Sequence, residues 1–576
     1  MKIRFQKISV RTSILGCALF ILTMSGCQST SESSGISQRP SSQTPEALLA
    51  AAASASYTRA AELRLRAVEQ YLERQEFDLA EAALIELNAD NLDESAGARY
   101  ARAYAQILIN AGNFLEANTL LTRRPLESAL DYQLVATACA GLNNHSCAAD
   151  GWIQASLTLG YGAENLPPDI HDTIWRHLSA ARSGPKVFSH RYHHAWWSLQ
   201  QMIREAGSIP GQLQAWQQWQ RQNPSHPARI KPPTALAQLQ NYSPPRIAVM
   251  LPLSGNLSGA GRAVRDGFVG AYLADASTER ALVRFYDTGS KPIAQVWEAV
   301  LENDHDVAIG PLIKPNVQTF AELTMTAQLP RLSLNYLALD DDNLGGLFQL
   351  GIAIEDEARS LVTHMLLAGH ERVMIVHSQS PWSRRANTAF TEQWPFPITT
   401  SEFVDVKGLT EAVGSAMLTA ESEDRKAELQ RLLGTKLEFL PRARKDLDAI
   451  VALTTNVESQ ALVPALRFHF GEHLPVYATS QAVRLGKADA LKSFKMTELP
   501  LLAASSFQPL NKAFSVAGSN FAELYALGYD AYRVGTWLPL LQTDSQLSIP
   551  GASGHLWLDG DGIFHRELDL IDLGAR

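Results

Sequence analysis

One stretch of the 576-residue chain decides its fold class: 244-PPRIAVMLPLSGNLSGAGRAVRDGF-268. The two prolines end whatever helix precedes them, because proline cannot continue a helix. The aliphatic run Arg246–Leu253 then predicts a buried strand, and the pattern after Ser254 predicts a helix that begins near Gly259. A strand followed at once by a helix is the repeating unit of a parallel α/β sheet.

Short apolar runs of the same kind continue to the end of the chain and alternate with helical patterns. We predict nine strands: Arg246–Leu253, Leu282–Tyr286, Val307–Ile309, Leu332–Leu334, Phe348–Ile352, Val373–His377, Ala449–Leu453, Val476–Thr479 and Leu501–Ala504. Such alternation indicates parallel sheets with helices on both faces, and nine strands within residues 245–576 suit two lobes better than one. Leu409–Leu440 is expected to be an inserted helical excursion, and Leu556–His565 a hairpin closed by an Asp-Gly turn.

Upstream of the prolines, residues 46–240 predict an all-α domain, because apolar residues recur three and four apart. Within it, 72-LERQEFDLA-80 aligns with 109-INAGNFLEA-117 at an offset of 37 residues. A period in the thirties predicts tetratricopeptide-like helix pairs, whose curved surface binds a protein or a polymer or serves only as a scaffold. Near the end of this domain, Trp216 and Trp219 fit a helix core better than a carbohydrate-binding platform.

The first 26 residues predict a secretion signal. They carry four cations and no acid, and their apolar run Ile14–Met24 is too short to span a bilayer. The signal ends in Met24-Ser-Gly-Cys27, like a bacterial lipobox that is cut before a cysteine to be lipidated. An ordinary signal peptide with an incidental cysteine is the alternative. Gln28 after the cysteine favours the outer membrane, and residues 27–45 are then a lipidated, flexible linker.

Charge narrows the classes of partner. Removal of the signal takes four positive charges away and lowers the formal net charge from −9 to −13. An acidic body argues against nucleic acid or anionic lipid as the main partner.

Two cysteines, Cys139 and Cys147, remain once Cys17 leaves with the signal and Cys27 is lipidated. In the oxidising periplasm they are candidates for a local disulfide across the turn between them. The alternative is two small residues buried in helix packing.

Candidate ligand residues lie at strand ends. In open α/β folds ligands bind beyond the carboxyl ends of strands, so Ser254, Gly255 and Ser333 are candidate cleft residues, with simple turn chemistry as the alternative. No cofactor is expected. No metal site is expected either, because the cluster of His190, His193 and His194 has no acidic or cysteine partner at ligand spacing.

Several motifs, taken in their order along the chain, resemble the LpoA (LppC) lipoprotein family. They are the lipobox at Cys27, the helical repeats, the boundary from Trp216 and Trp219 to His226-Pro227-Ala228, Ile247–Gly255 with Gly259-Ala-Gly261, Arg265–Phe268, Gly310-Pro311-Leu312, Arg442–Ala449 and Gly528–Ala531. The resemblance covers nearly the whole chain. It implies a tetratricopeptide-like domain followed by a two-lobed domain like a type I periplasmic binding protein.

The same resemblance implies a function. The family members are outer-membrane activators of penicillin-binding protein 1A, a class A synthase, and their carboxy-terminal domain is thought to contact the synthase. We therefore expect a non-catalytic regulator of peptidoglycan synthesis, anchored by lipid on the periplasmic face of the outer membrane. The alternative is a solute or muropeptide receptor, for which only Ser254, Ser333 and Tyr336 offer cleft groups. An enzyme is disfavoured, because no base, nucleophile and orienting group can be assembled from the sequence.

Overall fold

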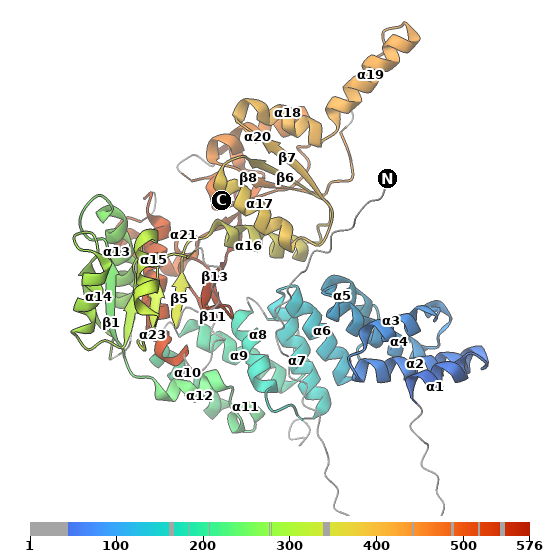
Figure 1. The fold of residues 1–576 in the computed structure, drawn as a ribbon, viewed down its shortest axis with the longest axis horizontal. Helices are drawn as coiled ribbons and strands as arrows, with labels where there is room; N and C mark the ends of the chain where they lie inside the picture. The colour runs from blue at the N-terminus through green and yellow to red at the C-terminus, as the bar shows by residue number, and fades with distance from the viewer. Residues whose placement is uncertain are drawn as a thin grey trace, which may run out of the picture.

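The computed structural model places helices first and two α/β lobes after them (Figure 1). It describes residues 44–160, 166–181, 184–206, 208–275, 277, 279–325, 327–337, 346–439, 443–484, 489–516, 519–541 and 548–575. The predicted signal, Cys27 and nearly all of the predicted linker lie outside the described residues. Among the helices that are described, none combines the length and apolarity needed to cross a membrane.

The helical domain begins with helix pairs that repeat. Its first elements are α1 (Pro45–Ala52), α2 (Tyr57–Glu73), α3 (Phe77–Ile85), η1 (Ala89–Asn91), α4 (Glu94–Asn110), α5 (Phe114–Thr122), α6 (Ala129–Gly141) and α7 (His145–Leu159). Helices α2 and α4 begin at residues 57 and 94, and α3 and α5 at 77 and 114, so both members of the pair recur at an offset of 37. Ala80 and Ala117, which the repeat placed in equivalent positions, are both fully buried.

The second half of the helical domain is built around tryptophan. Its elements are α8 (Ile170–Ala180), α9 (Arg191–Glu205), α10 (Ile209–Gln222), α11 (Pro227–Ile230), α12 (Thr234–Gln238) and η2 (Leu239–Asn241). Trp196, Trp216 and Trp219 are fully buried in one cluster, so the tryptophans at 216 and 219 belong to the core as predicted. The rings of Trp216 and Trp219 stack with centroids 5.2 Å apart, and Trp219 Nε1 donates to the Ala195 carbonyl at 2.8 Å.

Truncation of Trp219 to alanine is expected to destabilise this domain by about 3–5 kcal/mol, because it empties a buried site and removes a buried hydrogen bond. Thermal unfolding followed by circular dichroism would measure the loss. The matched control is Tyr57→Ala, a surface aromatic of the same domain that is 51% exposed. Equal losses in the two variants would contradict a core built on Trp219.

Lobe 1 contains an eight-stranded sheet in the order β11-β12-β13-β5-β4-β3-β1-β2. Its strands are β1 (Arg246–Leu251), β2 (Leu282–Asp287), β3 (Val307–Ile309), β4 (Arg331–Ser333), β5 (Leu347–Leu350), β11 (Ser548–Pro550), β12 (His555–Leu558) and β13 (Ile563–Glu567). Strands β1 to β5 and β13 pair in parallel, whereas β11, β12 and β13 form an antiparallel meander. The hairpin predicted at Leu556–His565 is confirmed as β12 and β13.

The helices of lobe 1 are α13 (Ser258–Ala274), α14 (Ile293–Leu301), α15 (Lys314–Thr324), α21 (Pro500–Ala503), η5 (Ser505–Phe507), α22 (Gln508–Phe514) and α23 (Ala522–Leu541). Helices α13 and α23 cross closely at two glycines. A Cβ on Gly267 would lie 1.9 Å from the Tyr525 carbonyl oxygen, and a Cβ on Gly528 would lie 1.9 Å from that of Val264. Only glycine permits this crossing, which joins the first and the last helix of the lobe.

Lobe 2 contains a six-stranded sheet in the order β14-β10-β9-β8-β6-β7. Its elements are α16 (Ile354–Leu367), β6 (Val373–Ser378), α17 (Pro381–Gln393), β7 (Ile398–Phe403), α18 (Val406–Ala416), α19 (Thr419–Leu433), β8 (Ala449–Leu453), α20 (Asn456–Phe468), β9 (Val476–Ala478), η3 (Ser480–Ala482), η4 (Asp489–Leu491), β10 (Phe494–Glu498) and β14 (Asp569–Asp572). Its strands pair in parallel except for β10 with β14.

Two predictions for this region need correction. The strand predicted at Leu501–Ala504 is wrong, because those residues lie in and just after α21, and the strand is β10. Pro500 at the start of α21 suits the first turn of a helix, where its missing N–H costs nothing. The excursion predicted at Leu409–Leu440 is also too long, since Leu409 and Val413 of α18 are fully buried in the lobe 2 core and only α19 extends outward.

Candidate functional site

The two lobes are joined by three crossings of the chain. The first leads from β5 to α16, the second from β10 to α21 and the third from β13 to β14. Two adjacent carboxylates at the start of α16, Asp356 and Glu357, contact the other two crossings. We call the polar cluster that they form the hinge network: Asp356, Glu357, Ser480, Thr497, His565 and Arg566.

Asp356 ties the first crossing to the third. Its Oδ1 lies 3.2 Å from His565 Nδ1 and accepts from Arg359 Nη1 at 3.1 Å, and its Oδ2 lies 3.6 Å from Arg566 Nε. The side chains of Asp356 and Arg566 are each only 1% exposed. Arg566 also donates to the Ala353 carbonyl at 2.9 Å, directly before α16. A buried ion pair with these added hydrogen bonds fixes the angle at which the chain enters lobe 2.

Glu357 ties the first crossing to the second. Its carboxylate accepts from the Ser480 N–H at 2.7 Å, from the Ser480 hydroxyl at 2.9 Å and from the Thr497 hydroxyl at 2.6 Å. Thr497 lies on β10 just before the chain returns to lobe 1. Glu357 therefore fixes the end of β10 within lobe 2. The bonds of Asp356 to His565 and Arg566 cross between the lobes, so these are the bonds that a change of lobe angle must rearrange.

The hinge network contains a histidine with a shifted pKa. Burial of His565 favours its neutral form, but its bonds to Asp356 at 3.2 Å and Asp559 at 2.9 Å outweigh burial and raise its pKa to about 9. His565 is therefore a cation in the folded protein at neutral pH, and it neutralises part of the buried acidic charge.

His565 makes the stability of the hinge depend on pH. A folded pKa of about 9 against an ordinary value near 6.5 corresponds to about 3 kcal/mol of stabilisation, fully present below pH 6.5 and lost as the pH rises through 9. We expect His565→Gln to lower the unfolding free energy most below pH 6.5, with a difference that shrinks towards pH 9. Urea unfolding of the wild type and the variant across this pH range tests the prediction. A difference in unfolding free energy that stays constant with pH would show that the titration of His565 does not contribute to stability.

The structure places Ser254 and Gly255 in a tight turn at the carboxyl end of β1. The Leu253 and Ser254 N–H groups donate to Asp287 Oδ1 at 2.8 and 3.2 Å, and Gly255 has a φ of +74° that favours glycine. Partial burial alone would raise the pKa of Asp287, but the Ser254 side chain and backbone N–H groups, including that of Gly289, lower it to about 2. Ser254 is partly exposed and stays a predicted cleft residue.

Ser333 and Tyr336 are bonded within lobe 1. Ser333 is fully buried, and its hydroxyl donates to the Asn335 carbonyl at 2.9 Å. The Tyr336 hydroxyl lies 3.1 Å from the Gly351 carbonyl oxygen and 3.0 Å from that of Phe564. Gly351 lies in the first crossing and Phe564 lies on β13, before the third, so Tyr336 contacts the chain near both. The arrangement makes Tyr336 a support of the hinge and leaves Ser333 no free hydroxyl hydrogen for a ligand.

One ion pair spans the two lobes away from the hinge network. Arg484 follows η3 in lobe 2, and its Nη1 lies 3.1 Å from Glu523 Oε2 in the first turn of α23 in lobe 1. Burial raises the pKa of Glu523, and Arg484 opposes the rise. The pair favours the lobe angle seen here over a more open one.

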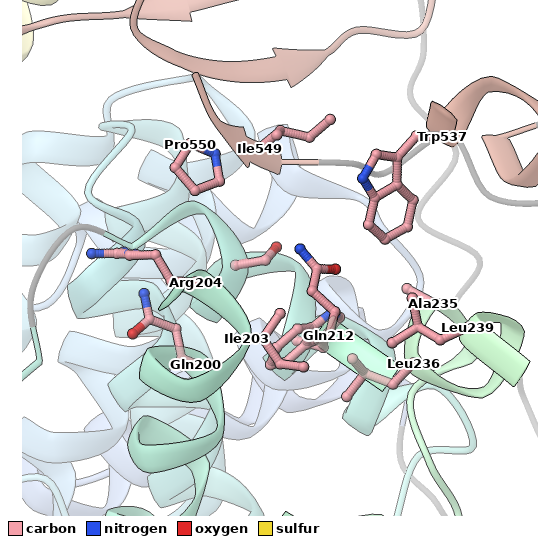
Figure 2. Close-up of a pocket in the computed structure, with 12 residues that line it drawn as sticks. Gln200, Ile203, Arg204, Gln212, Ala235, Leu236, Leu239, Trp537, Ile549 and Pro550 are labelled. Carbon is pink, nitrogen blue, oxygen red and sulfur yellow. The ribbon is translucent and has the colours of Figure 1, made fainter. Parts of the chain in front are cut away.

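Lobe 1 is docked on the helical domain. Figure 2 shows Trp537, Ile549 and Pro550 of lobe 1 facing helical residues that include Gln200 and Arg204. The cavity between them measures only about 50 Å³, and Trp537 also packs against the buried tryptophan cluster. The helical domain and lobe 1 therefore form one continuous packed body.

Lobe 2 faces the helical domain across an open groove of about 510 Å³. The helical wall comes from the turns around Phe114 and Leu142, and the lobe 2 wall from α16 and the end of α17, including Leu366, Glu392 and Phe396. Along these walls a groove, and not a closely packed interface, separates lobe 2 from the helical domain.

The histidine cluster has an acidic partner that its sequence spacing hid. His193 Nε2 lies 2.8 Å from Asp150 Oδ1 on α7, and Trp197 Nε1 donates to the same oxygen at 2.8 Å. The pair crosslinks α7 and α9. Over the described residues no group of three or more His, Cys, Asp or Glu is placed to hold a metal ion.

Cys139 of α6 and Cys147 of α7 are joined by a disulfide in the structure, with Cα atoms 5.8 Å apart. We expect the exported protein to carry this bond. Trypsin leaves both cysteines in one peptide, because no Lys or Arg lies between residues 125 and 175. Without reductant that peptide should resist alkylation and be lighter by the two thiol hydrogens. If both cysteines of the native protein were alkylated without reductant, they would be free thiols and the predicted disulfide would be wrong.

Comparison with protein families gives a match over almost the whole chain. The model of the family of LppC putative lipoproteins matches residues 38–574. The penicillin-binding protein activator LpoA of Vibrio cholerae serotype O1 is 25% identical over 542 residues, which cover 89% of each chain. The activator LpoA of Aliivibrio fischeri is 23% identical over 592 residues, covering 98% of this chain and 97% of its own.

Solved structures give a likeness of fold. A monoclinic crystal form of LpoA from Haemophilus influenzae matches with a TM-score of 0.51 and 19% identity, covering 93% of this chain and 97% of that one. The C-domain of the Haemophilus influenzae protein, named a regulator of PBP1A, covers 57% of this chain and 97% of its own with a TM-score of 0.45 and 19% identity.

Proposed function

This chain belongs to the family of LppC putative lipoproteins, and from that premise we propose that it binds and activates a class A penicillin-binding protein. The observation that carries the proposal is similarity along nearly the whole chain to relatives named penicillin-binding protein activators. Like them, it is a regulator and not an enzyme. The proposed partner is a synthase of the penicillin-binding protein 1A type, because a C-domain of similar length is named a regulator of PBP1A.

The architecture supports an activator that works through its shape. An allosteric activator favours one state of its partner by binding that state more tightly than the other. Here a body made of the helical domain and lobe 1 carries lobe 2 on three crossings held by Asp356 and Glu357. The two parts can present two separate surfaces to a synthase at a defined angle.

The proposal includes the placement of the protein in the cell. We place it on the periplasmic face of the outer membrane, held by lipid on Cys27, with residues 27–45 as the linker. The eighteen residues from Gln28 to Pro45 reach roughly 60 Å when fully extended. The repeating helix pairs, which we propose are tetratricopeptide-like, add length between the linker and the two lobes, whose overall form we propose is that of a type I periplasmic binding protein.

The rates of glycan polymerisation and cross-linking by a purified class A synthase, with and without residues 28–576, test the proposal. We expect both binding and a higher rate. A class B penicillin-binding protein is the control for partner class, and it should show neither. Absence of both effects with the class A enzyme would favour the alternative, a solute or muropeptide receptor. A screen of cell-wall fragments for a change of lobe angle would then follow.

A further inference from the structure

A single helix projects from lobe 2 into solvent. Helix α19 and the segment after it, Thr419–Phe439, form what we call the arm, which extends beyond the rest of the lobe in Figure 1. Only its base is anchored: Thr419 is buried, and its hydroxyl lies 2.6 Å from His469 Nδ1. From Glu421 to Phe439, all of which the structure describes, no residue is buried.

The arm lacks the packing that usually stabilises a helix. An isolated helix of about fifteen residues is marginal in water, because most helical stability in proteins comes from packing of an apolar face. Yet this helix exposes three leucines: Leu429 is 44% exposed, Leu432 76% and Leu433 59%. Exposed leucines grouped at the end of an unpacked helix are typical of a surface that another molecule covers.

The leucines share one face with two cations. Residues three, four and seven apart lie on the same side of a helix, so Arg425, Leu429 and Leu432 form one row and Lys426, Leu429 and Leu433 another. We call these five residues the arm stripe. Lys426 Nζ lies 5.2 Å from the ring of Phe439, which adds a partly exposed aromatic beside the stripe. The acids Glu423, Asp424 and Glu428 lie off the stripe, on the other sides of the helix.

The charge of the arm distinguishes the kinds of surface that could cover it. Residues 419–439 hold five acids and four bases, a net charge of −1, which gives no attraction to an anionic membrane. The stripe itself is basic and apolar. Its complement is an apolar groove on a protein, with acidic side chains where Arg425 and Lys426 would lie, which is the familiar mode of a helix in a groove.

We propose that the arm stripe binds in an acidic-rimmed apolar groove of the class A synthase. The inference rests on the proposed function and names the surface through which it acts. Because the arm belongs to lobe 2, a synthase bound there acts on the lobe that the hinge network joins to the packed body of the helical domain and lobe 1. Binding at the arm then couples the angle of lobe 2 to the state of the synthase.

The test compares the affinity of residues 28–576 for the purified class A synthase with that of the Leu432→Glu/Leu433→Glu double variant. We expect at least a tenfold weaker Kd, since a few central apolar side chains carry most of the energy of an interface. Because these leucines make no buried contact, thermal unfolding should be unchanged. The Arg425→Glu/Lys426→Glu double variant should also bind more weakly. The difference in Kd between this variant and the wild type should become smaller at raised salt, because salt screens the charges. The matched control is Leu301→Glu, an exposed leucine of lobe 1 that is 60% exposed.

Each result decides between the inferences. Loss of affinity in the arm variants with an unchanged Leu301→Glu supports the arm. Wild-type affinity in the leucine double variant overturns the arm proposal and leaves the proposed function standing. Absence of binding by the wild-type chain overturns both. A last outcome would overturn the arm proposal in favour of self-association. The wild-type chain would sediment as a dimer, the leucine double variant would sediment as a monomer, and both would bind the synthase equally well, so the arm would bind a second copy of this chain.

Discussion

A Cys27→Ala variant is expected to leave the membrane fraction completely. Each buried CH2 group of an acyl chain contributes about 0.8 kcal/mol to membrane attachment, so several chains on one cysteine hold a protein far more firmly than a single chain does. The acidic charge of the mature chain disfavours adhesion to anionic lipid once these acyl chains are absent. Fractionation of cells that express the variant, with labelled palmitate as a second readout, measures the effect.

The chain contains its own control for this experiment. Cys17 lies inside the predicted signal and leaves with it, so Cys17→Ala should change neither attachment nor labelling. Continued membrane attachment of the Cys27→Ala protein would place the anchor elsewhere. Wild-type protein in the soluble fraction and without palmitate would favour the ordinary signal peptide over the lipobox.

An Asp356→Ala variant is expected to lose about 3–5 kcal/mol of stability. Its removal leaves the guanidinium of Arg566 without a buried counter-charge and takes away one of the two carboxylates that hold the cationic ring of His565. Breaking one side of a buried ion pair costs that much. For a lobe of this size the loss corresponds to a fall of roughly 10 °C in melting temperature. Calorimetry would show it, and stimulation of a synthase should fall with it because the lobe angle is no longer fixed.

The neighbouring residue gives the matched control. Glu355 precedes Asp356 in the same helical turn. Its carboxylate Oε1 lies 2.8 Å from Nε of Arg385, but the side chain of Arg385 is 61% exposed. An exposed pair contributes at most about 1 kcal/mol, so Glu355→Ala should melt close to the wild type. If the two variants melted alike, the hinge network would contribute no more than a surface ion pair.

Short-range patterns in the sequence were sufficient to predict most elements of the fold. The break at Pro245, the run Arg246–Leu253, the 37-residue repeat and the hairpin near Asp559 are all properties of neighbouring residues, and each lies where the sequence placed it. The error at Leu501–Ala504 arose because four apolar residues after a proline suit a short buried strand and the first turn of a helix equally well.

The hinge network could not be predicted in the same way. Glu355-Asp356-Glu357 is an acidic run at a helix start, which the helix dipole explains without any special role. Nothing nearby in sequence shows that Asp356 and Glu357 are buried while Glu355 stays near the surface. Their partners Arg566 and Thr497 lie more than a hundred residues further along the chain.

The sequence by itself determined that this chain has a helical domain followed by α/β lobes, which family it resembles, and which cysteine is proposed to carry the lipid, because periodicity and short motifs are local. Only the tertiary structure decided that lobe 1 packs on the helical domain while lobe 2 faces it across a groove, and that Asp356 and Glu357 hold the crossings. It also decided that the leucines of α19 stay uncovered. Burial and ion pairing depend on residues distant in sequence, and no local pattern encodes which of them meet.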